Sequence, residues 1–272
     1  MVDVRYPSGL VHPKGLGYIS ETYKIIFIPI PKNASTSVRS IGNLEFRQGN
    51  FLAYKTRIAN GEYKTFAILR EPISRFVSGY IEVCKRATGD STAILKRDFY
   101  WIKNPHKRFI LFLDELESEW FDAHMFPQHY FLYDYEDKPY SVDAYIDMKC
   151  LDSALPVVLG RFGAPITKFS KQNQHGSVRV ISPKEIKDKY LNFKNYQRSL
   201  YFIADATVRR INRRRLPDNK EIYEIVRSDK RLEQRIIKLY ERDIELYRQA
   251  QEAWGRNKTG ICWNRDSWTK PL

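Results

Sequence analysis

The sequence predicts an α/β fold in which helices flank a mainly parallel central sheet, with a helix-rich C-terminal half. Three observations support this prediction. Apolar runs at residues 23–28 and 65–69 each lead into a short polar loop and then into a helix-like pattern. That order of strand, loop and helix is typical of parallel α/β proteins. The composition, with 43% hydrophobic and 14% aromatic residues, provides enough apolar side chains for a packed core and excludes a disordered chain.

The first strand is expected at residues 23–28. This run is almost wholly apolar, which favours a central strand that is buried on both faces. Pro29 and Pro31 cannot donate to a strand ladder, so the strand should end near residue 28. The prolines and glycines of residues 1–20 predict an irregular lead-in before it.

The later elements follow from apolar spacing. We expect a helix at residues 109–116, strands at 131–135 and 142–146, and a helix at 151–162. Helical patterns dominate from residue 183 onward. One face of a long final helix would carry Ile236, Leu239, Tyr240, Ile244 and Tyr247. The tail, residues 255–272, shows no clear periodicity.

The first polar loop is suited to binding an anion. It consists of Pro31, Lys32, Asn33, Ala34, Ser35, Thr36 and Ser37. Its small residues let the backbone approach oxygen atoms closely, and its hydroxyls lie in a first helical turn. Lys32 adds a mobile charge that can follow the charge built up during a transfer. Glycine is absent and the lysine comes first, so this is not the nucleotide-binding P-loop. An ordinary Ser/Thr-rich helix cap fits the same residues.

The second polar loop begins at Arg70, which can make a forked contact with a phosphate group. Pro72 suits a first helical position, and Ser78 can donate from the second turn of that helix. The alternative is that Arg70 pairs with Glu71 and that Ser78 merely lets helices approach. Anions bind at helix N-termini, so two such loops suggest a ligand with two separated anionic groups.

In this order and at this separation, the two loops resemble the cofactor loops of the PAPS-dependent sulfotransferases, specifically the carbohydrate (Golgi-type) branch and its bacterial relatives. PAPS is 3′-phosphoadenosine-5′-phosphosulfate. The resemblance implies a P-loop-like sulfotransferase fold, with a single catalytic domain at residues 21–254. It also implies that residues 31–37 hold the 5′-phosphosulfate and that Arg70 and Ser78 hold the 3′-phosphate. The product would be 3′,5′-ADP, and no metal would be needed.

Looser matches extend the resemblance along the chain. Residues 124–128 are similar to the H-x-x-P-Q element of the family, residues 145–155 to the strand and helix that follow it, and residues 239–247 to its closing helix. Lys149 stands where an acidic residue is common in the family.

Sulfuryl transfer needs a base for the acceptor hydroxyl and donors for the leaving phosphate. Lys32 is the candidate donor. His124 is the first candidate base because imidazole titrates near neutral pH and because it matches the family histidine. A histidine that only packs and hydrogen-bonds a carbonyl is the alternative. Related enzymes often place the base between the two loops, so Glu45 is the rival and His175 a more distant one.

The net charge of +14 predicts attraction to polyanions. The expected partner is a glycan or another hydroxyl-bearing acceptor, with anionic glycans among the candidates. The densest basic cluster consists of Arg209, Arg210, Arg213, Arg214 and Arg215. A solvated helix face is the favoured explanation of this cluster, and a docking strip for an anionic acceptor is the alternative. Nucleic acid is not expected, because no motif typical of nucleic-acid binding accompanies the charge.

Cysteine usage and the N-terminal sequence bear on the compartment. Cys84, Cys150 and Cys262 are too scattered for a disulfide framework or a zinc site, which fits a reducing compartment. Residues 1–17 contain no long apolar run, so no signal peptide or membrane anchor is visible. We therefore expect a soluble, cytoplasmic enzyme of bacterial or viral type, although a trimmed Golgi luminal domain would look the same.

Two other classes of protein stay open at this point. A nucleotide or metabolite kinase on a related scaffold would require magnesium and ATP. A non-catalytic module that binds polyanions would show salt-dependent binding and no response to 3′,5′-ADP.

Overall fold

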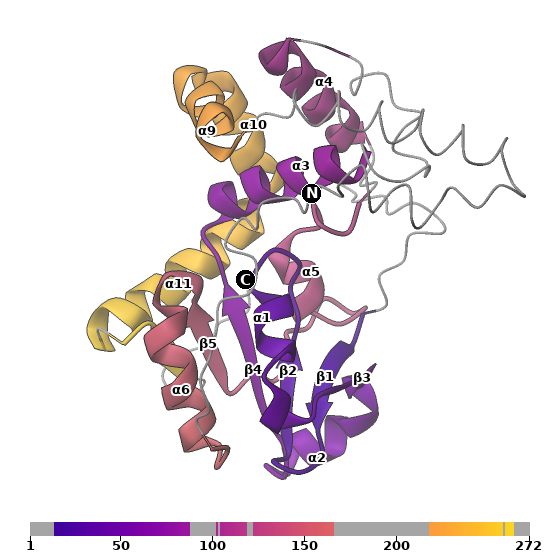
Figure 1. Cartoon of the computed structure of the whole chain (residues 1–272), viewed down its shortest axis with the longest axis vertical. Helices are drawn as coiled ribbons and strands as arrows, with labels where there is room; N and C mark the ends of the chain where they lie inside the picture. Colours follow the sequence, from indigo (N-terminus) through magenta and orange to yellow (C-terminus); the bar gives the residue numbers. More distant parts are fainter. Residues whose placement is uncertain are drawn as a thin grey trace, which may run out of the picture.

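A six-stranded mixed sheet forms the centre of the protein (Figure 1). In this computed structural model the described residues are 14–87, 102, 104–118, 122–165, 218–257 and 259–263, with only the backbone described for residues 85–87, 256 and 257. The strands are β1 Leu16–Ser20, β2 Ile25–Ile28, β3 Arg47–Asn50, β4 Lys64–Leu69, β5 Ala144–Asp147 and β6 Ile261–Trp263. Their order across the sheet is β3-β1-β2-β4-β5-β6.

The three central strands are parallel, as the sequence predicts. β4 pairs in parallel with β2 on one side and with β5 on the other. The outer strands β1, β3 and β6 join by antiparallel pairing. The expectation of an irregular lead-in is wrong for residues 16–20, which form β1, and the tail likewise contributes β6 to the sheet. Residues 1–13 and 264–272 lie outside the described residues.

The strand side chains alternate between two cores, one on each face of the sheet. Ile26 and Leu69 belong to the core that also contains residues of the helices α3, α4, α9, α10 and α11. Phe27 and Phe66 belong to the core on the opposite face, which includes Leu155 of α6. All four residues of β2 are buried, which explains why this strand reads as a continuous apolar run.

Helices cover both faces of the sheet. They are α1 Ser35–Arg39, α2 Lys55–Ala59, α3 Pro72–Ala87, α4 Pro105–Ser118, α5 Gln128–Leu132, α6 Leu151–Arg161, α9 Asn219–Ser228, α10 Lys230–Leu239 and α11 Glu241–Asn257, with short 3₁₀ turns η1 Gly42–Leu44, η2 Phe51–Tyr54 and η5 Met148–Cys150. In Figure 1, α3, α4, α9 and α10 gather beyond the carboxyl end of β4, while α2 lies at the opposite end of the sheet. The predicted helices at 109–116 and 151–162 are confirmed by α4 and α6.

The predicted strand at residues 131–135 is wrong. Phe131 lies in α5, and Tyr133 makes only an isolated bridge with Pro139. Aromatic residues in a short run favour a strand by propensity, but here burial against the helical core decides the conformation. The other predicted strand, at 142–146, is confirmed by β5, which begins at Ala144.

The long final helix of the prediction is two helices that break at Tyr240. The hydroxyl of Tyr240 donates to the carbonyl of Met125, so the break occurs where this side chain is anchored in the core. Asp229 ends α9 and its side chain accepts from the N–H of Arg231 at the start of α10. His175 and the arginine cluster of residues 209–215 lie outside the described residues.

Candidate functional site

The first loop leaves β2 at its carboxyl end in a strained conformation. Lys32 and Ala34 have φ angles of 70° and 57°, in the left-handed region that residues with a Cβ rarely adopt. Such a residue costs about 1–3 kcal/mol unless its surroundings hold it. Asn33, which is fully buried between them, donates from Nδ2 to the carbonyl of Ile68 at 2.7 Å. The loop is therefore pinned to β4, and its unusual shape is imposed by the fold.

This conformation leaves peptide donors free at the start of α1. Ala34 is the N-cap residue and has no side-chain acceptor for them. Among the described residues, no acceptor meets the N–H groups of Ser35 or Thr36. Both residues are partly exposed, so these groups and their hydroxyls can meet a ligand. With only five residues in α1, the contribution comes from the free N–H groups themselves and little from a helix dipole.

Arg70 joins the second loop to the first. Its Nη1 donates to the carbonyl of Lys32 at 3.1 Å, and its Nε donates to Oγ of Ser74 at 3.1 Å. Burial lowers the pKa of Arg70, while the neighbouring Tyr223 and Glu71 act in the opposite direction. Tyr223 lies in α9, far along the chain, and nothing in the local sequence signals that it belongs to this site.

The N-terminus of α3 is already occupied by a carboxylate. Glu71 accepts from the N–H of Ile73 at 2.9 Å and from the N–H of Ser74 at 2.7 Å. The expectation that an anion meets free N–H groups at both helices is therefore wrong for the second loop. The candidates left for contact with an anion are the side chain of Arg70, just before α3, and that of Ser78 in the second turn of α3.

The ammonium group of Lys32 lies against α3. Its Nζ is 3.2 Å from Oε2 of Glu82, and these two side chains are 24% and 29% exposed. Glu82 follows Ser78 by four residues on the same helix, so both lie on one face of α3. Lys32 and Ser78 are thus brought to the same part of the molecule. The sequence reasoning missed Glu82, although its spacing from Ser78 on a predicted helix was a usable signal.

The backbone of His124 packs against α3 at Gly79. A Cβ added to Gly79 would lie 2.8 Å from the carbonyl oxygen of His124, so the two backbones are in close contact. The Nδ1 atom of His124 is 2.7 Å from Oδ1 of Asp122, which also accepts the backbone N–H of His124. This contact with a carboxylate fixes the orientation of the ring and engages Nδ1, so Nε2 is the ring nitrogen left for a proton transfer. His124 stays a candidate base, with Asp122 as its orienting partner.

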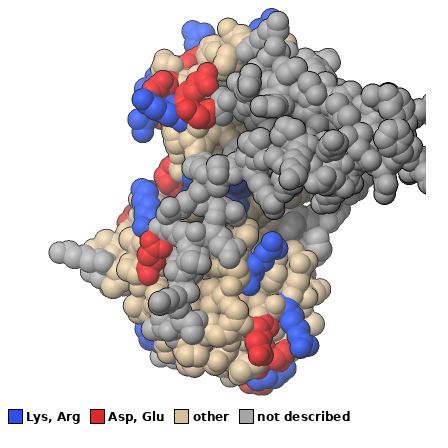
Figure 2. Space-filling model, in the orientation of Figure 1, with Lys and Arg blue, Asp and Glu red and all other residues tan. Residues whose placement is uncertain are grey.

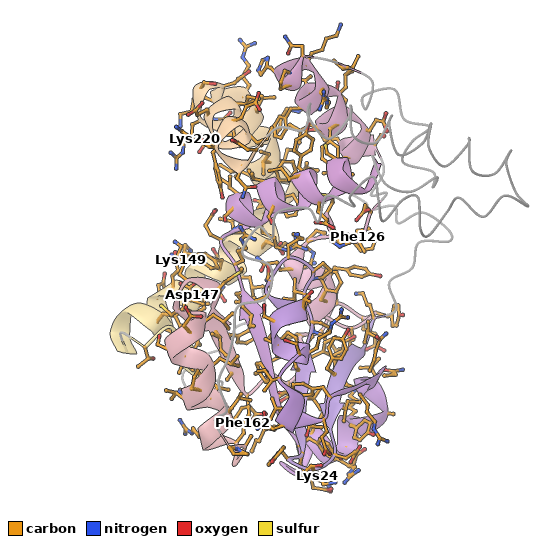
Figure 3. The ribbon with its side chains drawn as sticks, in the orientation of Figure 1. Lys24, Phe126, Asp147, Lys149, Phe162 and Lys220 are labelled. Atoms are coloured by element: carbon orange, nitrogen blue, oxygen red, sulfur yellow. The ribbon has the colours of Figure 1, made fainter. Side chains whose placement is uncertain are left out.

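Glu45 is not part of this site. Its Oε2 accepts from Oγ1 of Thr22 at 3.0 Å, and Thr22 lies in the turn between β1 and β2. That turn is at the amino end of β2, whereas both loops leave the carboxyl ends of β2 and β4. Figure 3 shows Lys24, from the same turn, at the lower end of the molecule, well below Phe126 near its middle. The structure therefore places Glu45 away from both loops, because proximity in sequence did not bring proximity in space.

Charged groups of both signs lie side by side on the described surface (Figure 2). At the end of the sheet where β2 begins, the carboxylate of Glu21 accepts hydrogen bonds from the hydroxyls of Tyr54, at 2.7 Å, and of Tyr63. These hydrogen bonds lower the pKa of Glu21 from 4.5 to about 2. Lys24 lies 3.1 Å from the same carboxylate. This cluster ties the β1–β2 turn to η2 and β4 and has no contact with the two loops.

Two features are absent from the part of the chain that the structure describes. No helix there combines the length and apolarity that crossing a membrane requires. No group of three or more His, Cys, Asp or Glu side chains there is arranged to hold a metal ion.

Comparison with known proteins places the chain in a family. The model of the "Sulfotransferase family" matches residues 18–248, which include both loops, His124 and α10. The chain belongs to the sulfotransferase family. The search of curated proteins and the search of solved structures found no match. The mixed sheet with a parallel centre and flanking helices is consistent with the fold of a sulfotransferase, and membership supports sulfuryl transfer as the general activity of this chain.

Proposed function

We propose that this sulfotransferase transfers the sulfuryl group of PAPS to a hydroxyl group on a carbohydrate. One observation supports this above all. The two loops leave adjacent parallel strands at the same edge of the sheet, and Arg70 of the second contacts the carbonyl of Lys32 in the first at 3.1 Å. A single ligand with anionic groups at both ends can therefore contact both loops at once, and PAPS has such groups.

The donor would bind across this edge. Residues 31–37 would hold the 5′-phosphosulfate, for which Ser35 and Thr36 offer free N–H groups in a strained loop. The guanidinium of Arg70 and the hydroxyl of Ser78 would hold the 3′-phosphate. Because Arg70 is largely buried, its charge is only weakly screened by solvent, which strengthens its interaction with a phosphate.

The reaction would be an in-line displacement at sulfur. The acceptor oxygen forms the new S–O bond while the bond between sulfur and the bridging oxygen breaks, and 3′,5′-ADP leaves. His124 takes the proton of the acceptor hydroxyl at Nε2, and Asp122 stabilises the imidazolium that results. Lys32 donates to the bridging oxygen as negative charge develops there. Lys32 has to leave Glu82 to do so.

A carbohydrate acceptor is supported by the similarity of residues 124–128 to the H-x-x-P-Q element of the carbohydrate branch. The surplus of 14 positive charges favours acceptors that carry negative charge, such as a glycan with uronate or sulfate groups. Turnover with labelled PAPS across a set of glycans would identify the acceptor.

The Arg70→Ala variant tests the donor assignment. Calorimetry should show that it weakens binding of 3′,5′-ADP at least about tenfold, as expected for the loss of a charge-assisted phosphate contact, while binding of AMP changes little. Arg39→Ala is the matched control, since it removes an equal charge from an exposed position at the end of α1. Equal losses for 3′,5′-ADP and AMP would refute the 3′-phosphate assignment. A larger thermal shift with ATP–Mg²⁺ than with 3′,5′-ADP would instead identify a kinase.

A further inference from the structure

The side chain of Gln128 lies between the two loops and bonds to both. Its Oε1 accepts from Nδ2 of Asn33 in the first loop, at 2.6 Å. The same oxygen accepts from the backbone N–H of Arg70 in the second loop, at 3.0 Å. Its Nε2 donates to the backbone carbonyl of Arg70, at 2.8 Å. Gln128 and Asn33 are both fully buried, so these bonds are shielded from water.

This pattern requires an amide. The side-chain amide of Gln128 pairs with both the N–H and the C=O of Arg70, as a peptide group of a neighbouring strand would. It therefore continues the hydrogen-bond pattern of the sheet by one residue beyond the end of β4. The oxygen Oε1 of the same amide also accepts from Asn33, the residue that pins the strained first loop to β4. A carboxylate could not donate to the carbonyl of Arg70, and an apolar side chain could make none of these bonds.

Asp243 of α11 holds Gln128 in place. One carboxylate oxygen accepts the backbone N–H of Gln128, at 2.5 Å, and the other accepts the backbone N–H of His129, at 2.9 Å. Asp243 therefore caps α5, whose own N-cap residue, Pro127, has no side-chain acceptor. Burial lowers the pKa of Arg75 and attraction to Tyr240 and Asp243 acts in the opposite direction, while its Nε donates to the carbonyl of Pro31 in the first loop.

We propose that Gln128 is a positioning residue that fixes the two loops relative to each other, so that the 5′ and 3′ ends of one nucleotide bind in a coupled way. The proposal rests on the proposed function. Gln128 acts through Asn33 and Arg70 and need not touch the ligand. A ligand that spans both loops binds more tightly when the relative position of the loops is already fixed before binding. A ligand that contacts only one loop gains little affinity from this.

The experiment compares three nucleotides by calorimetry: 3′,5′-ADP, which spans both loops, and AMP and 3′-AMP, which each carry one of its two phosphates. In Gln128→Leu, which replaces the amide by an apolar side chain of similar size, we expect the Kd of 3′,5′-ADP to rise at least about tenfold. The Kd values of AMP and 3′-AMP should each rise less than about threefold, because each loop can adapt alone. The ratio of bisphosphate to monophosphate affinity is the decisive quantity, since general destabilisation would not change it.

Tyr240→Phe is the matched control. It removes a buried hydrogen bond to the carbonyl of Met125, close to the same segment, and leaves the bonds of Gln128 to Asn33 and Arg70 in place. It should lower the melting temperature and leave the affinity ratio unchanged. Gln128→Glu keeps the acceptor oxygen and loses the donor, so it should fall between wild type and Gln128→Leu, and it serves if Gln128→Leu does not fold.

Equal losses for all three nucleotides, or no loss for 3′,5′-ADP, would overturn the role of Gln128. Failure of the proposed function would look different. In that case the wild-type protein itself would not prefer 3′,5′-ADP to AMP, before any variant was compared.

Discussion

The ion pair between Lys32 and Glu82 should oppose binding of the donor. Nζ of Lys32 lies 3.2 Å from Oε2 of Glu82. In the proposed mechanism the same ammonium group contacts the bridging oxygen of the donor, so the pair has to open first. Replacing Glu82 by glutamine keeps the shape of the side chain and removes its charge.

The size of the effect follows from the geometry of the pair. At 3.2 Å and an effective dielectric constant of about 20, two unit charges attract each other by roughly 5 kcal/mol. Both side chains are about one quarter exposed to solvent. The free-energy costs of their lost hydration and lost side-chain entropy therefore cancel most of this attraction. A net value of about 1 kcal/mol is typical of the stronger partly exposed pairs. Glu82→Gln should therefore lower the Kd of 3′,5′-ADP about fivefold.

Calorimetric titration of 3′,5′-ADP into wild type and Glu82→Gln measures this change. Glu62→Gln is the control variant, since Glu62 pairs with Arg57 at 2.9 Å on the exposed surface near α2, away from the two loops. In a Lys32→Ala background, Glu82→Gln should have no further effect, because the pair no longer exists. Unchanged or weaker binding in Glu82→Gln would show that Lys32 does not have to leave Glu82, and the reasoning would fail.

Four further predictions concern turnover, packing at two glycines, and pH. Lys32→Ala should lower kcat for sulfuryl transfer by about 100-fold or more, measured with labelled PAPS, because its charge acts on the leaving oxygen; a loss confined to KM would contradict this. Gly79→Ala should lower the unfolding free energy by about 1–3 kcal/mol in urea titrations, since the new methyl group would lie 2.8 Å from the carbonyl of His124. Gly255→Ala, in α11 with open space around it, should raise the unfolding free energy by about 0.5–1 kcal/mol. Glu21 has its pKa lowered from 4.5 to about 2, so the stability it contributes is present above pH 4.5 and is lost as the pH falls toward 2. The difference in melting temperature between wild type and Glu21→Gln should shrink over that range, and a constant difference would argue against the hydrogen bonds that lower this pKa.

The two loops could be predicted from the sequence because each is continuous in the chain. The apolar run of β2, the residue types of the first loop and the spacing from Arg70 to Ser78 are all local, and local patterns reflect strand burial and helix periodicity directly. The central parallel strands followed from the same reasoning. The meeting of both loops at one edge of the sheet is a consequence of this arrangement, since parallel strands end on the same side.

The parts that failed depend on contacts between distant residues. Nothing near Asp243 signals that it caps a helix beginning 115 residues earlier. β6 pairs with β5 across a separation of more than a hundred residues, and its three residues carry no strand pattern of their own. Glu45 was chosen because it lies between the loops in sequence, whereas the carboxylate that contacts Lys32 is Glu82. Choosing between the two glutamates required knowing which end of the sheet each of them lies near, and this depends on the direction of the strands.

The cap that Asp243 provides has a consequence for how the protein is made. The segments around Lys32 and Arg70 leave the ribosome early, but the residue that anchors Gln128 is translated 115 positions after it. At about 5–20 residues per second, this delay is on the order of ten seconds. During that time the nascent chain has both of the proposed anion-binding segments, but Gln128, which is proposed to fix their relative position, is not yet anchored by Asp243. Competence to hold the nucleotide should therefore arise late in synthesis, and a chain that stops before α11 should lack it.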